Sequence, residues 1–246
     1  MTTATLDRPE HRNALDAEMR AALAETIDEA ARSADVRAVI LTGAGKAFCA
    51  GGDLGSFEEL HAARVYRHVS HALTSLLDAV ERLEKPVLAA IDGAATGVGL
   101  TLALCCDWRV AGPGARLLFR EGRLGLVPTH GGVTRLVKLV GLARAKEGLL
   151  GGDDLDGPAA LRLGLVSEIV DADPVAVARE RAARMLSRAP LSFGAAKRLV
   201  HAAADTDLRT GMLAESFAQT ALLGSDDHRE GLTAARERRE PVFFAR

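Results

Sequence analysis

The fold is decided by residues 86–106, which read Pro86-Val87-Leu88-Ala89-Ala90-Ile91-Asp92-Gly93-Ala94-Ala95-Thr96-Gly97-Val98-Gly99-Leu100-Thr101-Leu102-Ala103-Leu104-Cys105-Cys106. The apolar run at 87–91 is bounded by a proline and by Asp-Gly, which is typical of a fully buried strand. The following glycines predict turns, and the apolar residues 100–106 predict a buried helix. The uncharged stretch 93–106 is too short to cross a bilayer. The segment therefore predicts a strand, a glycine turn and a buried helix.

Similar elements flank this segment on both sides. Upstream, residues 1–9 predict a short extended segment, and apolar residues at helical spacing predict a helix at 16–33. Residues 36–42 predict a strand that ends at Gly43-Ala44-Gly45, and a second glycine turn at Gly51-Gly52 precedes a helix at 57–82. Downstream, the pattern predicts strands at 108–111, 116–119 and 165–170 and a helix at 131–140.

The last third of the chain is almost entirely helical in pattern. It predicts four helices, at 175–187, 192–204, 208–223 and 227–238. Strands and helices alternate over the first two-thirds of the chain, and the last third is helical. This order predicts an α/β core at 1–172 and a helical C-terminal region at 173–246.

Composition and charge exclude several classes of protein. The chain has 246 residues, of which 48% are hydrophobic, and its 31 Lys and Arg against 33 Asp and Glu give a net charge of −2. Such a balance predicts neither a nucleic-acid nor a membrane partner. The N-terminus carries no apolar leader, which predicts a cytoplasmic protein. The three cysteines form no C-x-x-C pair and have no histidine at ligand spacing, so we predict no metal site.

The glycine turns do not match the common nucleotide-binding motifs. Phe48 occupies the third glycine position of a dinucleotide fingerprint that would start at Gly43, and Ala47 replaces the Ser or Thr that follows the lysine of a phosphate loop. Two strands that end in glycine turns expose backbone N–H groups, and two such groups can bind one developing oxyanion. The alternative is that these glycines serve only to form turns.

The order and spacing of several motifs resemble the crotonase (enoyl-CoA hydratase/isomerase) superfamily. The resemblance covers nearly the whole chain and rests on residues 6–15 (LDRPEHRNAL), 46–54 (KAFCAGGDL), 85–93 (KPVLAAIDG), 97–99 (GVG), 121–128 (EGRLGLVP), 160–166 (ALRLGLV) and 229–232 (REGL). It implies an α/β fold, a crotonase-like spiral of ββα units, with a helical C-terminal trimerisation region that also covers the active site. The implied substrate is an acyl-CoA thioester with no cofactor, and the implied partner is a second copy of the chain, in a homotrimer or a dimer of trimers.

The resemblance also assigns candidate catalytic residues. By position, the N–H groups of Gly52 and Val98 would hold the thioester oxygen. Family hydratases carry two glutamates that activate water. Here register places Glu121 at one of these positions and Thr101 at the other, and a hydroxyl cannot act as a base near neutral pH. His130 would lie near the acyl end and assist proton transfer, or be a structural histidine.

CoA-binding residues follow from the same resemblance, although Arg12 and Lys46 could equally be surface residues. The residues that would contact CoA are Arg12, Lys46, Cys49, Ala50, Gly51, Asp53 and Leu54.

A single glutamate can take a proton from one carbon and return it to another. The pattern therefore favours an enoyl-CoA isomerase, which shifts a double bond. The alternatives are an enoyl-CoA hydratase, a crotonase that forms carbon–carbon bonds or decarboxylates its substrate, and a non-catalytic acyl-CoA-binding or scaffold subunit.

Overall fold

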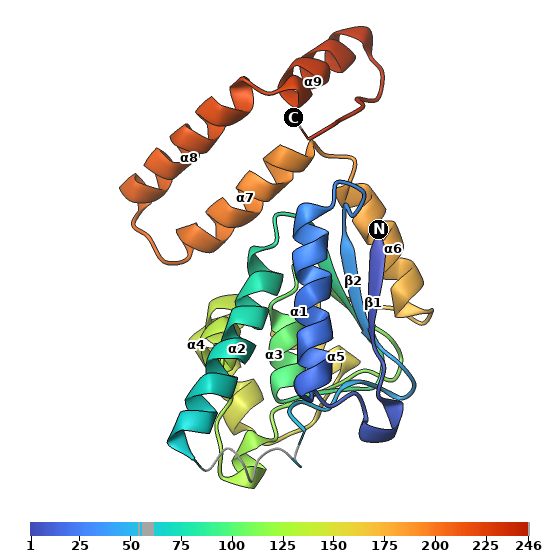
Figure 1. The fold of residues 1–246 in the computed structure, drawn as a ribbon, viewed down its shortest axis with the longest axis vertical. Helices are drawn as coiled ribbons and strands as arrows, with labels where there is room; N and C mark the ends of the chain where they lie inside the picture. The colour runs from blue at the N-terminus through green and yellow to red at the C-terminus, as the bar shows by residue number, and fades with distance from the viewer. Residues whose placement is uncertain (54, 56–61, 246) are drawn as a thin grey trace.

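The computed structural model describes residues 1–53, 55 and 62–245 (Figure 1). Its largest sheet is parallel throughout and consists, in spatial order, of β1 (Thr2–Leu6), β2 (Val39–Gly43), β4 (Val87–Ile91), β6 (Trp108–Ala111) and β9 (Glu168–Ile169). A second sheet consists of β3 (Ala47–Cys49), β5 (Ala94–Thr96), β7 (Arg116–Leu118) and β8 (Leu155–Asp156), of which only the β7–β8 pair is antiparallel.

From β2 to β7, successive strands alternate between the two sheets, and each pair of strands is followed by a helix. β2 and β3 lead to α2 (Ala63–Arg82), β4 and β5 to α3 (Val98–Leu104), and β6 and β7 to the 3₁₀ helix η4 (Glu121–Leu124) and α4 (Gly132–Leu150). This arrangement confirms the predicted α/β fold, a spiral of ββα units.

The N-terminal segment forms an abbreviated first coil. β1 leads through the 3₁₀ helix η1 (Pro9–His11) to α1 (Ala17–Arg32), and between them Leu15 forms an isolated parallel bridge with Gly52. Asn13 holds this coil against the next, because its buried Nδ2 donates to the carbonyls of Ala44 at 2.9 Å and Ala47 at 2.7 Å. α1 begins after Asp16, whose side chain accepts the Met19 N–H, as an N-cap residue does.

Strand β4 is buried on both faces, as its unbroken apolar run predicts. Leu88 and Ala90 pack in one cluster with Ala178 and Ala182 of α6 (Pro174–Met185). Val87, Ala89 and Ile91 belong to the main core on the other face. α6 therefore covers one face of the large sheet, while the main core fills the other.

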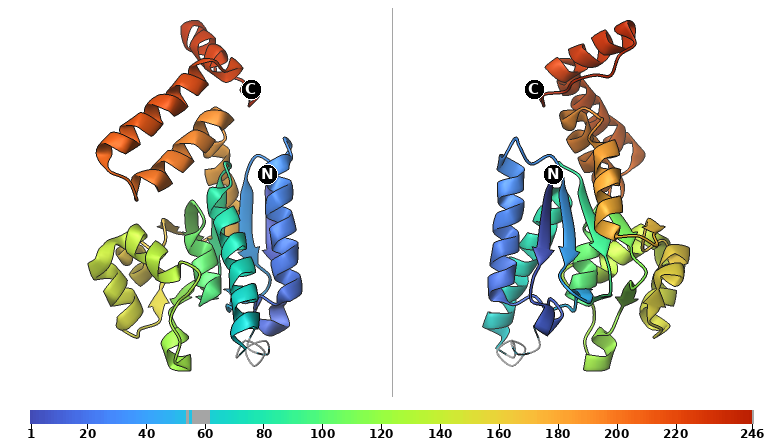
Figure 2. Two further views of the ribbon diagram at one scale, coloured as in Figure 1. Left: turned by 60° about the vertical axis from the view of Figure 1, so that its left-hand side comes forward. Right: turned by 90° about the vertical axis from the view of Figure 1, so that its right-hand side faces the viewer.

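The last three helices project from this body. α7 (Pro190–Ala203), α8 (Leu208–Leu223) and α9 (Asp226–Glu237) extend beyond α6, at the end of the body away from the start of α2 (Figures 1 and 2). Many of their large apolar side chains face solvent, including Leu208, which is 78% exposed, and Phe217, which is 69% exposed. Across the described parts of the chain, no helix is both long and apolar enough to cross a membrane.

Several predicted elements differ in extent from the observed ones. The helix expected to end at Val140 continues to Leu150 after a break at Gly141 (φ 77°, ψ 164°). The strand expected at 165–170 is confined to Glu168–Ile169, because the Leu165 N–H donates to Ala160 O and closes α5 (Gly157–Leu163). The helix expected at 57–82 is observed from Ala63, and residues 57–61 lie outside the described part of the chain.

Candidate active site

A cavity of about 590 Å³ lies where β3 and β5 end. Its floor is formed by the two glycine turns that follow these strands, and its walls by the first half of α2, by η4 and by the loop between η4 and α4. It is predominantly apolar, and Leu73 and Val69 of α2 contribute to its lining. Because β3 and β5 are parallel neighbours, the turns that follow them meet at one edge of the small sheet.

The two turns approach each other so closely that only glycine fits. Gly51 has a φ of 101°, and a Cβ there would lie 2.9 Å from Thr96 O and 3.5 Å from Val98 N. Gly97 has a φ of 56° and adjoins Gly51. These left-handed conformations are readily adopted by glycine.

Two backbone amides are available at this junction. Val98 is the first residue of α3, so its N–H has no acceptor within the helix. Gly52 forms a β-bridge with Leu15, in which the Leu15 N–H donates to Gly51 O at 2.7 Å. The Gly52 N–H itself has no acceptor among the described residues. Gly52 and Val98 both line the cavity, so the structure brings together the two residues predicted to hold the thioester oxygen.

Glu121 directs its carboxylate at the same junction. A Cβ on Gly97 would lie 3.6 Å from Glu121 Oε1. Oε2 is buried and finds no hydrogen-bond partner among the described residues. Burial raises the pKa of Glu121 above its ordinary value, because an ionised carboxylate loses hydration there. A carboxyl group of this kind is suited to accepting and returning a proton.

Thr101 also lines the cavity, but its hydroxyl is held by its own helix. Oγ1 donates to Gly97 O at 3.3 Å. A Cβ on Gly132 would lie 2.8 Å from this oxygen, so α4 packs directly against it. Among the described residues that line the cavity, Glu121 is the only one with a carboxylate.

His130 lies on the cavity wall in a left-handed conformation, with a φ of 56°. Its Nδ1 is 3.1 Å from Thr74 Oγ1, and its carbonyl accepts from Arg135 Nη1 at 2.7 Å. Burial lowers the pKa of His130, and a hydrogen bond to the Ser70 backbone partly offsets this effect. The ring is therefore predominantly neutral near pH 7.

The residues predicted to bind CoA are divided between the cavity and its surroundings. Ala50 and Gly51 line the cavity, whereas Arg12 and Lys46 are exposed and lie outside its lining. Cys49 is fully buried, packs against Gly99 and does not line the cavity. Burial raises the pKa of this thiol to about 12.

Asp53 is turned toward other protein groups. Its Oδ2 accepts from Arg8 Nη1 at 3.2 Å, and its Oδ1 accepts the Gly55 N–H at 3.0 Å. Leu54 lies outside the described residues. Within the described part of the chain, no three His, Cys, Asp or Glu side chains gather as a metal site would require.

The cavity is also lined by Arg20, Tyr66 and Arg120, which no sequence motif marks as site residues. Arg120 pairs with Asp154, at 2.5 Å between Nη2 and Oδ2. Arg20 belongs to α1, and nothing in the local pattern of that helix marks it. Only the Leu15–Gly52 bridge, a contact between distant segments, explains why the start of α1 reaches the cavity.

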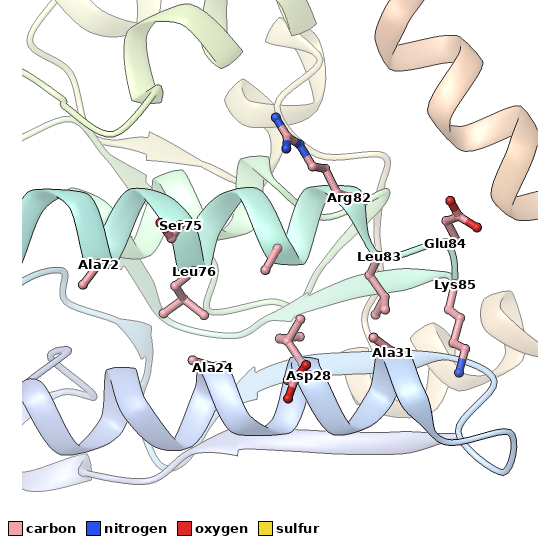
Figure 3. Close-up of a pocket in the computed structure, with 12 residues that line it drawn as sticks. Ala24, Asp28, Ala31, Ala72, Ser75, Leu76, Arg82, Leu83, Glu84 and Lys85 are labelled. Atoms are coloured by element: carbon pink, nitrogen blue, oxygen red, sulfur yellow. The ribbon is translucent and has the colours of Figure 1, made fainter.

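A second cavity, of about 490 Å³, lies between the later halves of α1 and α2 (Figure 3). Leu76 and Leu83 point from α2 and its end toward α1, where Ala24 and Ala31 face them. Asp28 pairs with Arg32 at 2.8 Å, and Lys85 Nζ donates to the carbonyls of Ala30 and Ser33. The charged groups of this cavity are thus largely engaged in protein contacts.

Comparison with known proteins identifies the family. Residues 1–246 match the family profile described as enoyl-CoA hydratase/isomerase. The chain is 36% identical over 248 residues to the enoyl-CoA isomerase/hydratase fer4 of Mycosarcoma maydis, covering 97% of this chain and 90% of that protein. It is 33% identical over 243 residues to the 2,3-dehydroadipyl-CoA hydratase of Escherichia coli, covering 98% and 94%.

A solved structure extends the likeness to three dimensions. The enoyl-CoA hydratase from Bacillus anthracis superposes with a TM-score of 0.94 at 34% sequence identity, covering 99% of this chain and 95% of that one. The chain belongs to the enoyl-CoA hydratase/isomerase family of the crotonase superfamily.

Proposed function

We propose that this protein shifts the double bond of an enoyl-CoA thioester, with Glu121 as the proton carrier. The observation that carries the proposal is the lining of the cavity. Glu121 is its only carboxylate among the described residues, and Thr101 lies by register where the family hydratases carry their other glutamate. One base that both removes and returns a proton suffices for this reaction.

In the proposed reaction, Glu121 takes a proton from C2 of a 3-enoyl thioester. The electron pair left at C2 is delocalised onto the thioester oxygen, to which the Gly52 and Val98 N–H groups donate. Fixed donors at a developing oxyanion stabilise it by about 3–4 kcal/mol for each donor. Glu121 then returns the proton to C4, so that the C3–C4 double bond becomes a single bond while the C2–C3 double bond forms, and the product has the same atoms as the substrate. Enolate formation in this way needs no cofactor.

The apolar cavity and the cations near it support an acyl-CoA substrate. In the proposal the acyl chain lies along Val69 and Leu73, and the backbone of Ala50 and Gly51 faces the thioester end. The exposed side chains of Arg12 and Lys46 would meet the CoA phosphates outside the cavity. His130, neutral and anchored to Thr74, would assist proton transfer as a hydrogen-bonding group rather than as a cation.

Hydration is the second candidate, and the Thr101 hydroxyl in the cavity favours it. A water held by Thr101 and Glu121 would add to a 2-enoyl thioester. Relatives at 33–34% identity are named as hydratases, among them the short-chain-enoyl-CoA hydratase of Clostridium acetobutylicum.

Deuterium uptake distinguishes these reactions. The protein is incubated in heavy water with saturated, 2-enoyl and 3-enoyl CoA thioesters, and product masses and double-bond positions are determined. We expect a shifted double bond, with deuterium taken up to the extent that the proton on Glu121 exchanges with solvent before its return, and a loss of about 100-fold to 10,000-fold in rate in Glu121→Gln. A mass gain of one water from the 2-enoyl substrates would instead favour hydration. Turnover that is unchanged in Glu121→Gln would contradict both assignments.

The proposed assembly is a homotrimer or a dimer of trimers, formed through the helical region at 173–246. The exposed apolar side chains of α7, α8 and α9 support this assembly. No described residue of that region lines the cavity of its own chain, so any cover that it supplies would lie over the site of a neighbouring copy.

A further inference from the structure

Arg20 is a cation on the cavity wall whose role the proposed reaction leaves open. It is half-buried on the second turn of α1, and its Nη1 donates to Leu15 O at 3.0 Å. Leu15 forms the bridge with Gly52, so this hydrogen bond fixes the guanidinium beside the turn that carries the Gly52 amide. A guanidinium has five N–H donors, and this contact uses one of them.

The carboxylates near Arg20 are paired with another residue. Arg8 Nη1 lies 3.1 Å from Asp16 Oδ2 and 3.2 Å from Asp53 Oδ2. Arg20 forms no ion pair with any carboxylate in the described part of the chain. The unpaired Glu121 oxygen does not bind it either. Arg20 thus lines a largely apolar cavity without a counter-ion from the described residues.

The other cations near the site are placed differently. Arg120 lines the cavity but is neutralised by Asp154. Arg12 and Lys46 are exposed and lie outside the lining, where the proposed function assigns them to the CoA phosphates. Arg20 is therefore the cation best placed to meet an anionic group inside the cavity, on the acyl part of the substrate.

We propose that Arg20 binds a carboxylate carried by the acyl chain, so that the preferred substrates are CoA thioesters of dicarboxylic acids. The inference rests on the proposed function for the identity of the ligand as an acyl-CoA thioester. A guanidinium pairs with a carboxylate through two parallel N–H···O bonds, and the low polarity of the surroundings strengthens the pair. Val69 and Leu73 would pack against the methylene groups between the carboxylate and the thioester.

Equilibrium binding of unreactive saturated thioesters tests the inference without turnover. Succinyl-, glutaryl- and adipyl-CoA are each compared by calorimetry with the butyryl-, pentanoyl- or hexanoyl-CoA of equal chain length. At least one dicarboxylic thioester should bind about 10-fold to 100-fold more tightly than its partner, as a charge-assisted hydrogen-bonded pair allows. Arg20→Gln should abolish this preference and leave the binding of the monocarboxylic thioesters within about twofold, and Arg20→Lys should restore part of it.

Arg32→Gln is the matched control. Arg32 lies on the same helix, is exposed, pairs with Asp28 and does not line the cavity. This variant should keep the wild-type preference.

Two results would overturn the inference. One is equal affinity for every matched pair of thioesters in the wild type. The other is that Arg20→Gln lowers the affinity equally for both thioesters of a matched pair, and that this effect disappears when 3′-dephospho-CoA thioesters are used. That result would place a CoA phosphate on Arg20. Deuterium uptake in the presence of either result would leave the proposed function standing. Absence of binding by all of the thioesters would overturn both.

Discussion

Glu121 is half-buried, and its Oε2 is buried without a hydrogen-bond partner among the described residues, which predicts how its replacement changes stability with pH. Since burial raises the pKa of Glu121, the folded state holds this proton at pH values where the unfolded state has released it. Its contribution to the free energy of unfolding therefore falls as pH rises from the ordinary value to the raised one. Glutamine is a neutral mimic of the protonated side chain. At pH 8, Glu121→Gln should therefore unfold at a temperature about 2–4 °C higher than the wild type, which corresponds to a gain of about 1 kcal/mol in the free energy of unfolding.

Calorimetric melting of both proteins between pH 4 and pH 8 checks this expectation. The difference between them should shrink toward pH 4, where Glu121 is protonated. A difference that stays constant across this range would show that ionisation of Glu121 does not oppose folding.

Removal of the Thr101 hydroxyl should distinguish isomerisation from hydration. Thr101→Val keeps the shape of the side chain and removes the donor to Gly97 O. If Glu121 alone carries the proton, double-bond isomerisation should stay within about threefold of wild type. Any hydration that uses Thr101 to hold water should fall by about tenfold or more, since a lost hydrogen bond of 1.5 kcal/mol corresponds to that factor. Rates on 3-enoyl and 2-enoyl thioesters measure both quantities, and an isomerisation rate reduced as strongly as the hydration rate would contradict the single-base mechanism.

The position of α3 relative to β3 depends on a glycine at their contact. A Cβ on Gly99 would lie 2.4 Å from Cys49 O and 2.6 Å from Cys49 Cβ, so α3 would have to move away from β3. Gly99→Ala should lower the free energy of unfolding by about 1–3 kcal/mol, as overpacking does. Movement of the Val98 amide should also reduce kcat/KM by about tenfold or more.

Gly211→Ala is the matched control for this substitution. Gly211 lies in the exposed helix α8, and a Cβ there would make only an ordinary contact of 3.7 Å with Thr206 Oγ1. This variant should be as stable as the wild type or more so, by up to about 1 kcal/mol, because alanine favours a helix over glycine. Urea unfolding and initial-rate kinetics on both variants test the pair. A Gly99→Ala protein with wild-type kinetics would show that the spacing of α3 and β3 does not set the geometry of the site.

Elements formed by local patterns could be predicted from sequence, and elements set by distant contacts could not. The run at Val87–Ile91 and the N-cap at Asp16 contain their own signals, and both appear where the pattern placed them. The run that begins at Leu165 also has the pattern of a strand. Its first residue instead closes α5 through a bond to Ala160, which depends on tertiary packing.

The same distinction applies to the site. Glu121, Gly52 and Val98 occupy characteristic registers in motifs, and the cavity brings them together. Arg20 carries no such mark, because it reaches the cavity only through the pairing of Leu15 with Gly52. Sequence patterns therefore indicated the residues at the glycine turns and missed a charged residue on the surrounding wall.

At the scale of the whole molecule, a buried ion pair ties the projecting helices to the body. Lys197 of α7 donates through Nζ to Asp107 Oδ2 at 2.8 Å and to Lys85 O at 3.3 Å. Burial raises the pKa of Asp107 despite the neighbouring lysine. Lys197→Met should lower the free energy of unfolding by about 3–5 kcal/mol, because it leaves a buried carboxylate without its cation.

The adjacent pair is a natural control for this prediction. Arg198 and Glu84 lie 3.0 Å apart and are exposed, with 68% and 53% of their side-chain surfaces accessible. Arg198→Met should therefore cost less than about 1 kcal/mol. Urea unfolding of the two variants provides the comparison, and equal losses in both would show that burial of the Lys197–Asp107 pair adds nothing.

The projecting helices also predict the behaviour of the chain in solution. Their exposed apolar side chains should be buried between subunits, so sedimentation velocity should show particles of three or six 25.9-kDa chains. Phe217→Asp should shift the population toward single chains, because Phe217 on α8 is 69% exposed in one chain. Leu161→Asp on α5, a partly exposed apolar position of the body, is the control expected to keep the wild-type distribution. Single wild-type chains at micromolar concentration would contradict the assembly.

Each coil of the spiral supplies one group of the site: Gly52 follows β3, Val98 follows β5 and Glu121 follows β7. A chain emerging from a ribosome can pair β2 with β4 before Glu121 meets the two amides, since the lining is complete only once His130 has been synthesised. Pairing between successive coils brings together segments far apart in sequence, which is the slow kind of contact in folding. Binding of nascent chains to an immobilised acyl-CoA thioester would therefore report the chain length at which the coils pack together. Only molecules whose coils have packed would be retained.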